Sequence, residues 1–110
     1  MTVDELKGRA LRWTYSDGPV KGKVFEHEFT NDGTVSWKAP GDTTPSADSS
    51  AAYEFARVND AVYVFSYLSG SGYTLTTVVD ERSGAIVSFA SNEKELVVQH
   101  GRIEGGERAT

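Results

Sequence analysis

The stretch that decides the fold runs from residue 9 to residue 38 and reads RALRWTYSDGPVKGKVFEHEFTNDGTVSWK. Apolar and polar residues alternate in three short segments of it, which is the period-two pattern of half-buried strands. The segments are separated by SDGP at 16–19 and NDG at 31–33. Both favour tight turns, because glycine accepts a positive φ and Asp and Asn side chains hydrogen-bond nearby backbone. The stretch therefore predicts three antiparallel strands joined by two short turns.

The same alternation continues in the second half of the chain and predicts five further strands, over residues 52–58, 62–68, 73–80, 85–89 and 96–103. Between the two halves, residues 39–51 hold two prolines and a glycine but no large apolar residue. A segment of this length and composition predicts a mobile loop, and we expect it at the mouth of the fold as a ligand gate. Residues 62–68 are apolar or aromatic on both faces, so two inward rows stay open: Tyr63, Phe65 and Tyr67, or Val62, Val64 and Ser66.

Composition supports an all-β domain. Val, Ile and Thr together number 24, whereas Leu and Met number six, and β-branched residues favour strands. Eight short strands at near-even spacing predict an eight-stranded antiparallel lipocalin-like (calycin) barrel rather than a sandwich. In such a barrel the last strand pairs with the first. We expect a single domain over residues 1–110, with a short helical turn at 2–7, a core at 8–104 and a polar tail at 105–110.

Charge and cysteine content exclude several functions. The net charge is −5 and no basic stripe is present, so nucleic acid is not an expected partner. No apolar run approaches the length of a membrane span. There is no cysteine, which excludes disulfides, thiolate catalysis and cysteine–zinc sites. The polar N-terminus lacks the apolar core of a signal peptide, so a cytoplasmic location is expected. The sequence leaves open whether the protein forms a homodimer.

The predicted inward rows are rich in aromatic residues. Alternation places six large apolar side chains inside: Trp13, Phe25, Phe29, Val35, Trp37 and Phe55. Each of them could simply fill the core. Tyr and Trp, however, carry polar groups that need partners when they are buried, and a ligand inside the barrel would supply them. We therefore predict a small-molecule site, lined by Trp13, Tyr15, His27, Trp37, Tyr53 and His100.

His27 lies between Glu26 and Glu28. Neighbours on a strand point to opposite faces, so neither glutamate shares a face with the histidine, and no metal site forms from this triplet. His100, on the last strand, is expected to face the same cavity as Trp13 or Tyr15. A pair of histidines without a third ligand does not hold a metal, so neither a metal nor a cofactor is predicted. Tyr15 and His27 are the candidates for proton transfer, with a hydrogen-bonded core histidine as the alternative for His27.

These stretches also resemble a known family. Residues 11–18 (LRWTYSDG), 25–29 (FEHEF) and 35–37 (VSW) look like the first half of the calycin-type small barrels of the MoaF-like group, named after molybdenum cofactor biosynthesis protein F. Residues 62–67 (VYVFSY), followed by a glycine turn, look like the second half. The resemblance covers residues 8–104 and implies a small barrel. The name implies a link to molybdenum cofactor pathways but defines no reaction.

Phenolic acid decarboxylases share this architecture and are distantly similar. That family uses two tyrosines on the first strand, a glutamate and an arginine. Here Tyr15 matches the second tyrosine, and Trp13 stands at the position of the first. The glutamate position falls near Ala52, beside Glu54, and no arginine matches, since residues 39–51 replace that region.

Three functions follow from the sequence. The first is a lipocalin-like barrel that binds an aromatic or amphipathic small molecule. The second is a small lyase or isomerase, in which Tyr15, His27 and either Tyr53 or Glu54 transfer protons. The third is a structural role with a filled core. A sealed interior would favour the third, and a pocket of several hundred Å³ with a perturbed His or Glu would favour the second.

Overall fold

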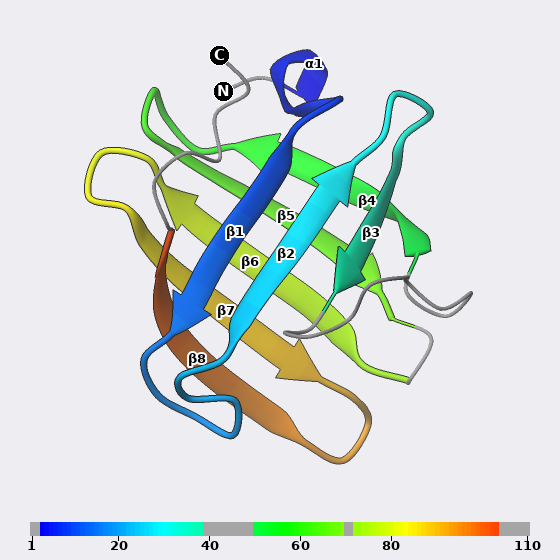
Figure 1. Cartoon of the computed structure of the whole chain (residues 1–110). Coiled ribbons are helices and arrows are strands. Elements are labelled where there is room, and N and C mark those ends of the chain that lie inside the picture. Colours follow the sequence, from blue (N-terminus) through cyan, green and yellow to red (C-terminus); the bar gives the residue numbers. More distant parts are fainter. Residues whose placement is uncertain (1–2, 39–49, 70–71, 104–110) are drawn as a thin grey trace.

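Eight antiparallel strands close into one barrel in chain order (Figure 1). The computed structural model describes residues 3–38, 50–69 and 72–103. The strands are β1 (Ala10–Tyr15), β2 (Val24–Phe29), β3 (Thr34–Lys38), β4 (Ser50–Arg57), β5 (Val62–Leu68), β6 (Thr74–Asp80), β7 (Ala85–Ser91) and β8 (Leu96–Ile103). The prediction of an eight-stranded antiparallel barrel is therefore confirmed.

The barrel closes where β1 pairs with β8, as the sequence predicted. Three residue pairs form this seam: Trp13 with Ile103, Thr14 with Arg102, and Tyr15 with Gly101. Close approach of the two backbones requires glycine at position 101, because a Cβ added there would overlap the carbonyl oxygen of Thr14 and lie 3.1 Å from the Cα of Tyr15. A lone glycine inside a strand commonly marks such an approach.

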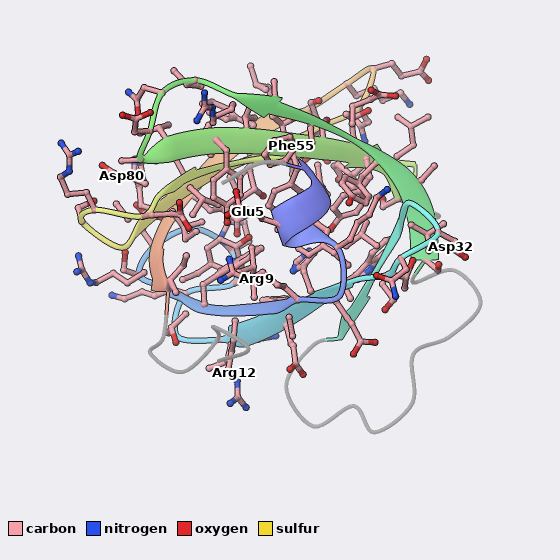
Figure 2. All side chains as sticks on the ribbon, turned by 90° about the horizontal axis from the view of Figure 1, so that it is seen from above. Glu5, Arg9, Arg12, Asp32, Phe55 and Asp80 are labelled. Atoms are coloured by element: carbon pink, nitrogen blue, oxygen red, sulfur yellow. The ribbon has the colours of Figure 1, made fainter. Side chains whose placement is uncertain are left out.

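One end of the barrel is covered by the short helix α1 (Val3–Leu6). Figure 2 looks down on this end and shows the helix lying across the barrel opening. Leu6 is fully buried and belongs to the hydrophobic core. The predicted helical turn is thus present, and its apolar side chain closes the barrel at this end.

The core follows the predicted alternation in β1 to β4. Trp13, Phe29 and Val35 are completely buried, and the other three predicted inward residues, Phe25, Trp37 and Phe55, pack against the same cluster. The prediction for all six is confirmed. The structure also decides the orientation of β5, whose inward row consists of the buried residues Tyr63, Phe65 and Tyr67.

Two strand boundaries differ by two residues from those predicted. β4 begins at Ser50, because Ser50 and Ala51 pair with β3 although neither is a strong strand former. β7 continues to Ser91, which pairs with Leu96 across the following turn. Pairing to a neighbouring strand overrides local propensity in both places. The predicted mobile loop falls, for residues 39–49, outside the described residues.

The face predicted for β8 was wrong. Leu96 and Val98 point outward, with 75% and 43% of their surfaces exposed, and His100 is exposed with them. The opposite row, Val97, Gln99 and Gly101, faces the interior. The physical reason is the seam, since Gly101 must lie against β1 and residues two apart on a strand share its face.

No helix within the described ranges is long and apolar enough to cross a membrane.

Candidate functional site

The half of the barrel away from α1 contains a cavity of about 520 Å³, within the size range of small-molecule sites. Residues of the β1–β2, β5–β6 and β7–β8 connections line it, and these connections lie at the lower end of the barrel in Figure 1. We therefore place the mouth of the cavity at this end. The described lining consists of Tyr15, Pro19, Val20, Phe25, His27, Trp37, Tyr67, Ser69, Tyr73, Leu75, Ala90, Glu95, Val97 and Gln99. The interior is therefore not sealed.

His27 lies in the wall between this cavity and the filled half of the barrel. Its ring stacks on Trp13 at a centroid distance of 4.5 Å and an interplanar angle of 15°. Its Nε2 atom lies 2.7 Å from the Tyr67 hydroxyl. Burial lowers the pKa of the imidazole to about 3, because desolvation penalises the charged form. The side chain is therefore neutral at physiological pH.

The surroundings of His27 favour one tautomer of its imidazole. Its Nδ1 atom is buried and has no hydrogen-bond partner among the described residues. An unpaired buried N–H is rarer than an under-satisfied acceptor, which favours the tautomer that carries the proton on Nε2. In that tautomer Nε2 donates to the Tyr67 oxygen. Tyr67 has no second partner in the described chain, and burial keeps its pKa raised. With the proton on His27 Nε2, the Tyr67 O–H is left as a donor, and Tyr67 lines the cavity.

A flat aromatic wall stands beside this donor. Trp37 stacks on Tyr67 with ring centroids 4.5 Å apart and an angle of 24°. Phe25 meets Tyr15 edge-on at 5.6 Å. Because these rings come from four different strands of a closed barrel, their positions are fixed by packing. Such a wall suits the face of a planar apolar ligand.

The Tyr15 hydroxyl belongs to a buried hydrogen-bond chain. It donates to Ser88 Oγ at 3.0 Å, and Ser88 Oγ lies 3.0 Å from Thr77 Oγ1. Burial raises the pKa of the Tyr15 phenol, and the hydrogen bond to Ser88 offsets part of that effect. The Tyr15 phenol therefore stays protonated, and its hydrogen bond is made within the barrel.

Gln99 is a polar cavity residue that the sequence analysis missed. It lines the cavity from β8, and its buried Oε1 atom has no partner in the described part of the chain. Gly18, with φ of +78°, packs directly over it, since a Cβ at that position would lie 2.8 Å from Gln99 Cγ. The β1–β2 turn thereby holds the amide in place beside the cavity.

Three of the six predicted site residues line the cavity: Tyr15, His27 and Trp37. Trp13 contributes indirectly, by stacking on His27. Tyr53 packs edge-on against Phe29 at 5.1 Å and is not part of the lining.

The prediction that His100 faces the cavity was wrong. Its Nδ1 atom lies 2.9 Å from Asp17 Oδ2 on the outside of the barrel, and its backbone N–H donates to Asp17 Oδ1. More than half of its side-chain surface is exposed. The alternation of β8 directs it outward, as the inward positions belong to Gln99 and Gly101.

Within the described ranges, no three His, Cys, Asp or Glu side chains gather closely enough to hold a metal ion.

Comparison with known proteins agrees with this architecture. A family model described as the MoaF N-terminal domain matches residues 1–95. The chain belongs to the MoaF family. Among solved structures, this MoaF chain is similar to one described as "a putative beta-lactamase from Burkholderia vietnamiensis", with a TM-score of 0.74 and 13% identity, covering 94% of this chain and 98% of that one. At that identity the likeness shows the fold alone. No curated protein sequence matches the chain.

Proposed function

We propose that this MoaF-family barrel binds a small aromatic or amphipathic molecule in its open half. The observation that carries the proposal is the cavity of about 520 Å³, in which aromatic walls surround a few polar groups. This combination of an apolar body and sparse polar anchors is typical of small-molecule sites. The open cavity argues against the third reading of the sequence, a filled core with a purely structural role.

The contacts suggest how such a ligand would lie. An arene would stack on the face formed by Trp37 and Tyr67. The free O–H of Tyr67, supported from behind by His27, would donate to an oxygen or nitrogen acceptor of the ligand. The Gln99 amide would offer a second polar contact from the opposite strand pair.

A lyase or isomerase activity is less well supported. Efficient proton transfer requires a group whose pKa lies near the working pH. Burial instead lowers the pKa of His27 to about 3, which makes it a poor base at neutral pH. The pKa of Tyr15 is raised, and its O–H donates a hydrogen bond to Ser88 Oγ. No arginine is present in the described lining to hold a carboxylate substrate. We therefore favour binding over catalysis.

Filling the cavity tests the proposal. Val97 and Val98 are neighbours on β8, but Val97 lines the cavity whereas Val98 points outward. Val97→Trp is expected to weaken binding of the neutral probe N-phenyl-1-naphthylamine at least about tenfold, because the indole occupies the space of the ligand. Val98→Trp, the matched control, should change the affinity less than about twofold. Probe emission measures both, and calorimetry excludes an optical artefact of the added indole.

If both variants bind the probe as the parent protein does, the probe site is not this cavity. Failure of the parent protein to bind any neutral aromatic probe would contradict the proposed function itself.

A further inference from the structure

The described lining of the cavity carries a negative charge but no positive one. Its described lining contains no lysine or arginine and a single carboxylate, that of Glu95. Lys21, Lys23 and Lys94 occupy the turns around the mouth, but all three are exposed and none belongs to the lining. The formal net charge of the chain is also negative. An anionic ligand would therefore lose its hydration without meeting a countercharge in this lining.

Glu95 is held at the mouth by two neighbouring turns. Asn92 Oδ1 accepts hydrogen bonds from the backbone N–H groups of Lys94 and Glu95, at 2.8 and 2.7 Å, and so fixes the β7–β8 turn. From the β5–β6 side, the Tyr73 hydroxyl donates to Glu95 Oε2 at 2.5 Å. Tyr73 lines the cavity as well. The carboxylate thus has a defined position, and no hydrogen bond within the described part of the chain occupies its second oxygen.

Below the mouth, the walls disfavour charge of either sign. Burial lowers the pKa of His27 and raises that of Tyr15, so this region stabilises neither a cation nor an anion. The aromatic wall of Trp37 and Tyr67 lies in the same region. A bound molecule would therefore place its uncharged arene inside and keep any charged group near Glu95.

We propose that the cavity takes a small aromatic amine, with the arene against Trp37 and Tyr67 and the ammonium group paired with Glu95. The proposal rests on the proposed binding function and adds the charge of the ligand. Ammonium groups pair with carboxylates and are also attracted to aromatic faces such as that of Tyr73.

A series of three ligands of one shape tests the charge. 3-Phenylpropylamine, 3-phenylpropan-1-ol and 3-phenylpropionate share the arene and chain length, and at neutral pH they are cationic, neutral and anionic. Calorimetry at low ionic strength is expected to give the order amine, alcohol, carboxylate. The amine should bind about tenfold more tightly than the carboxylate, because the interaction with Glu95 reverses its sign between the two.

Glu95→Gln identifies the group responsible. The amide keeps the shape of the side chain and an oxygen that can accept from Tyr73, but removes the charge. We expect the amine to bind about threefold to fivefold more weakly to this variant, with the alcohol unchanged. Glu93→Gln is the matched control, because Glu93 belongs to the same turn, is exposed and does not line the cavity. It removes the same net charge and should leave all three affinities within about twofold.

The outcomes separate this proposal from the binding function. An equal or tighter affinity for the carboxylate, or equal losses in the Glu95 and Glu93 variants, overturns the amine proposal while cavity binding stands. If none of the three ligands binds although N-phenyl-1-naphthylamine does, the amine proposal is likewise overturned. If the neutral probe also fails to bind, both proposals fall.

Discussion

Replacing Gly101 with alanine is expected to lower the free energy of unfolding by about 3 kcal/mol, at the upper end of the usual cost of overpacking. The added methyl group would overlap the Thr14 carbonyl oxygen. Because the obstacle is backbone, no side-chain rotation relieves it, and β8 must move away from β1. That seam consists of only three residue pairs in the described chain. Chemical denaturation measures the loss, and hydrogen exchange should show faster exchange at residues 13–15 and 101–103.

Gly22→Ala provides the control for this prediction. Gly22 has φ of +82° and nothing within 4 Å of the position of an added Cβ. Alanine there suffers from the backbone conformation alone, at a cost of about 1 kcal/mol. Gly101 is not among the positive-φ glycines, so its larger loss must come from the close approach of the strands. A smaller loss for Gly101→Ala than for Gly22→Ala would contradict the described closure of the barrel.

Acidification from pH 7 to pH 5 is expected to reduce the free energy of unfolding by about 2 kcal/mol through His27 alone. The folded-state pKa of about 3 lies below the ordinary value of 6.5. Between these values the unfolded chain binds a proton that the folded chain does not. The contribution of His27 to the free energy of unfolding is therefore fully present when the pH is well above 6.5, and it declines as the pH falls toward 3. Down to pH 5 the loss depends mainly on the unfolded-state pKa, because the folded imidazole stays neutral.

Denaturation curves at the two pH values check this contribution. His27→Gln removes the titrating group while keeping an amide that can reach Tyr67, so the difference between pH 7 and pH 5 should shrink by about 2 kcal/mol. The control is His100→Gln, which changes the exposed histidine beside Asp17 and should retain most of the parent's pH dependence. An unchanged pH dependence in His27→Gln would show that the folded imidazole is accessible to protons.

The strands of the first half could be predicted because the face that the barrel buries is also the face that the sequence pattern marks as apolar. In β1 and β2 the buried row is also the more apolar row, with Trp13 and Phe29 among its members. The turns carry glycines at Gly18 and Gly33, both with positive φ. Each local preference therefore agreed with the closed barrel, and alternation alone was sufficient to place the core.

In β8 the alternation of apolar and polar residues is ambiguous. The outward row contains Leu96 and Val98, and the inward row contains Val97 and Ile103 beside Gln99 and Gly101, so hydrophobicity does not decide which face is buried. Gln99 lines the cavity and Gly101 lies at the seam with β1, and neither of these two positions needs an apolar side chain. One signal was available in the sequence: the isolated Gly101, which marks close backbone approach and therefore the inward parity.

Part of the cavity lining was predicted for a similar reason. Tyr15, His27 and Trp37 share parity with obvious core residues, so their positions in the lining could be expected. Glu95 and Tyr73 come together across two turns, and no local pattern encodes that contact. Tyr67 belonged to a strand that is apolar on both faces, where alternation cannot decide which row is buried.

The central claim, that the open half of the barrel is a ligand site, is tested most directly by locating a bound probe. Isotope-filtered NOE spectra of the carbon-13-labelled protein with unlabelled N-phenyl-1-naphthylamine would report which methyl groups the probe contacts. We predict NOEs to Leu75 and Val97, which line the cavity. NOEs confined to Leu96 and Val98, the exposed methyl groups on the outer face of β8, would contradict the account.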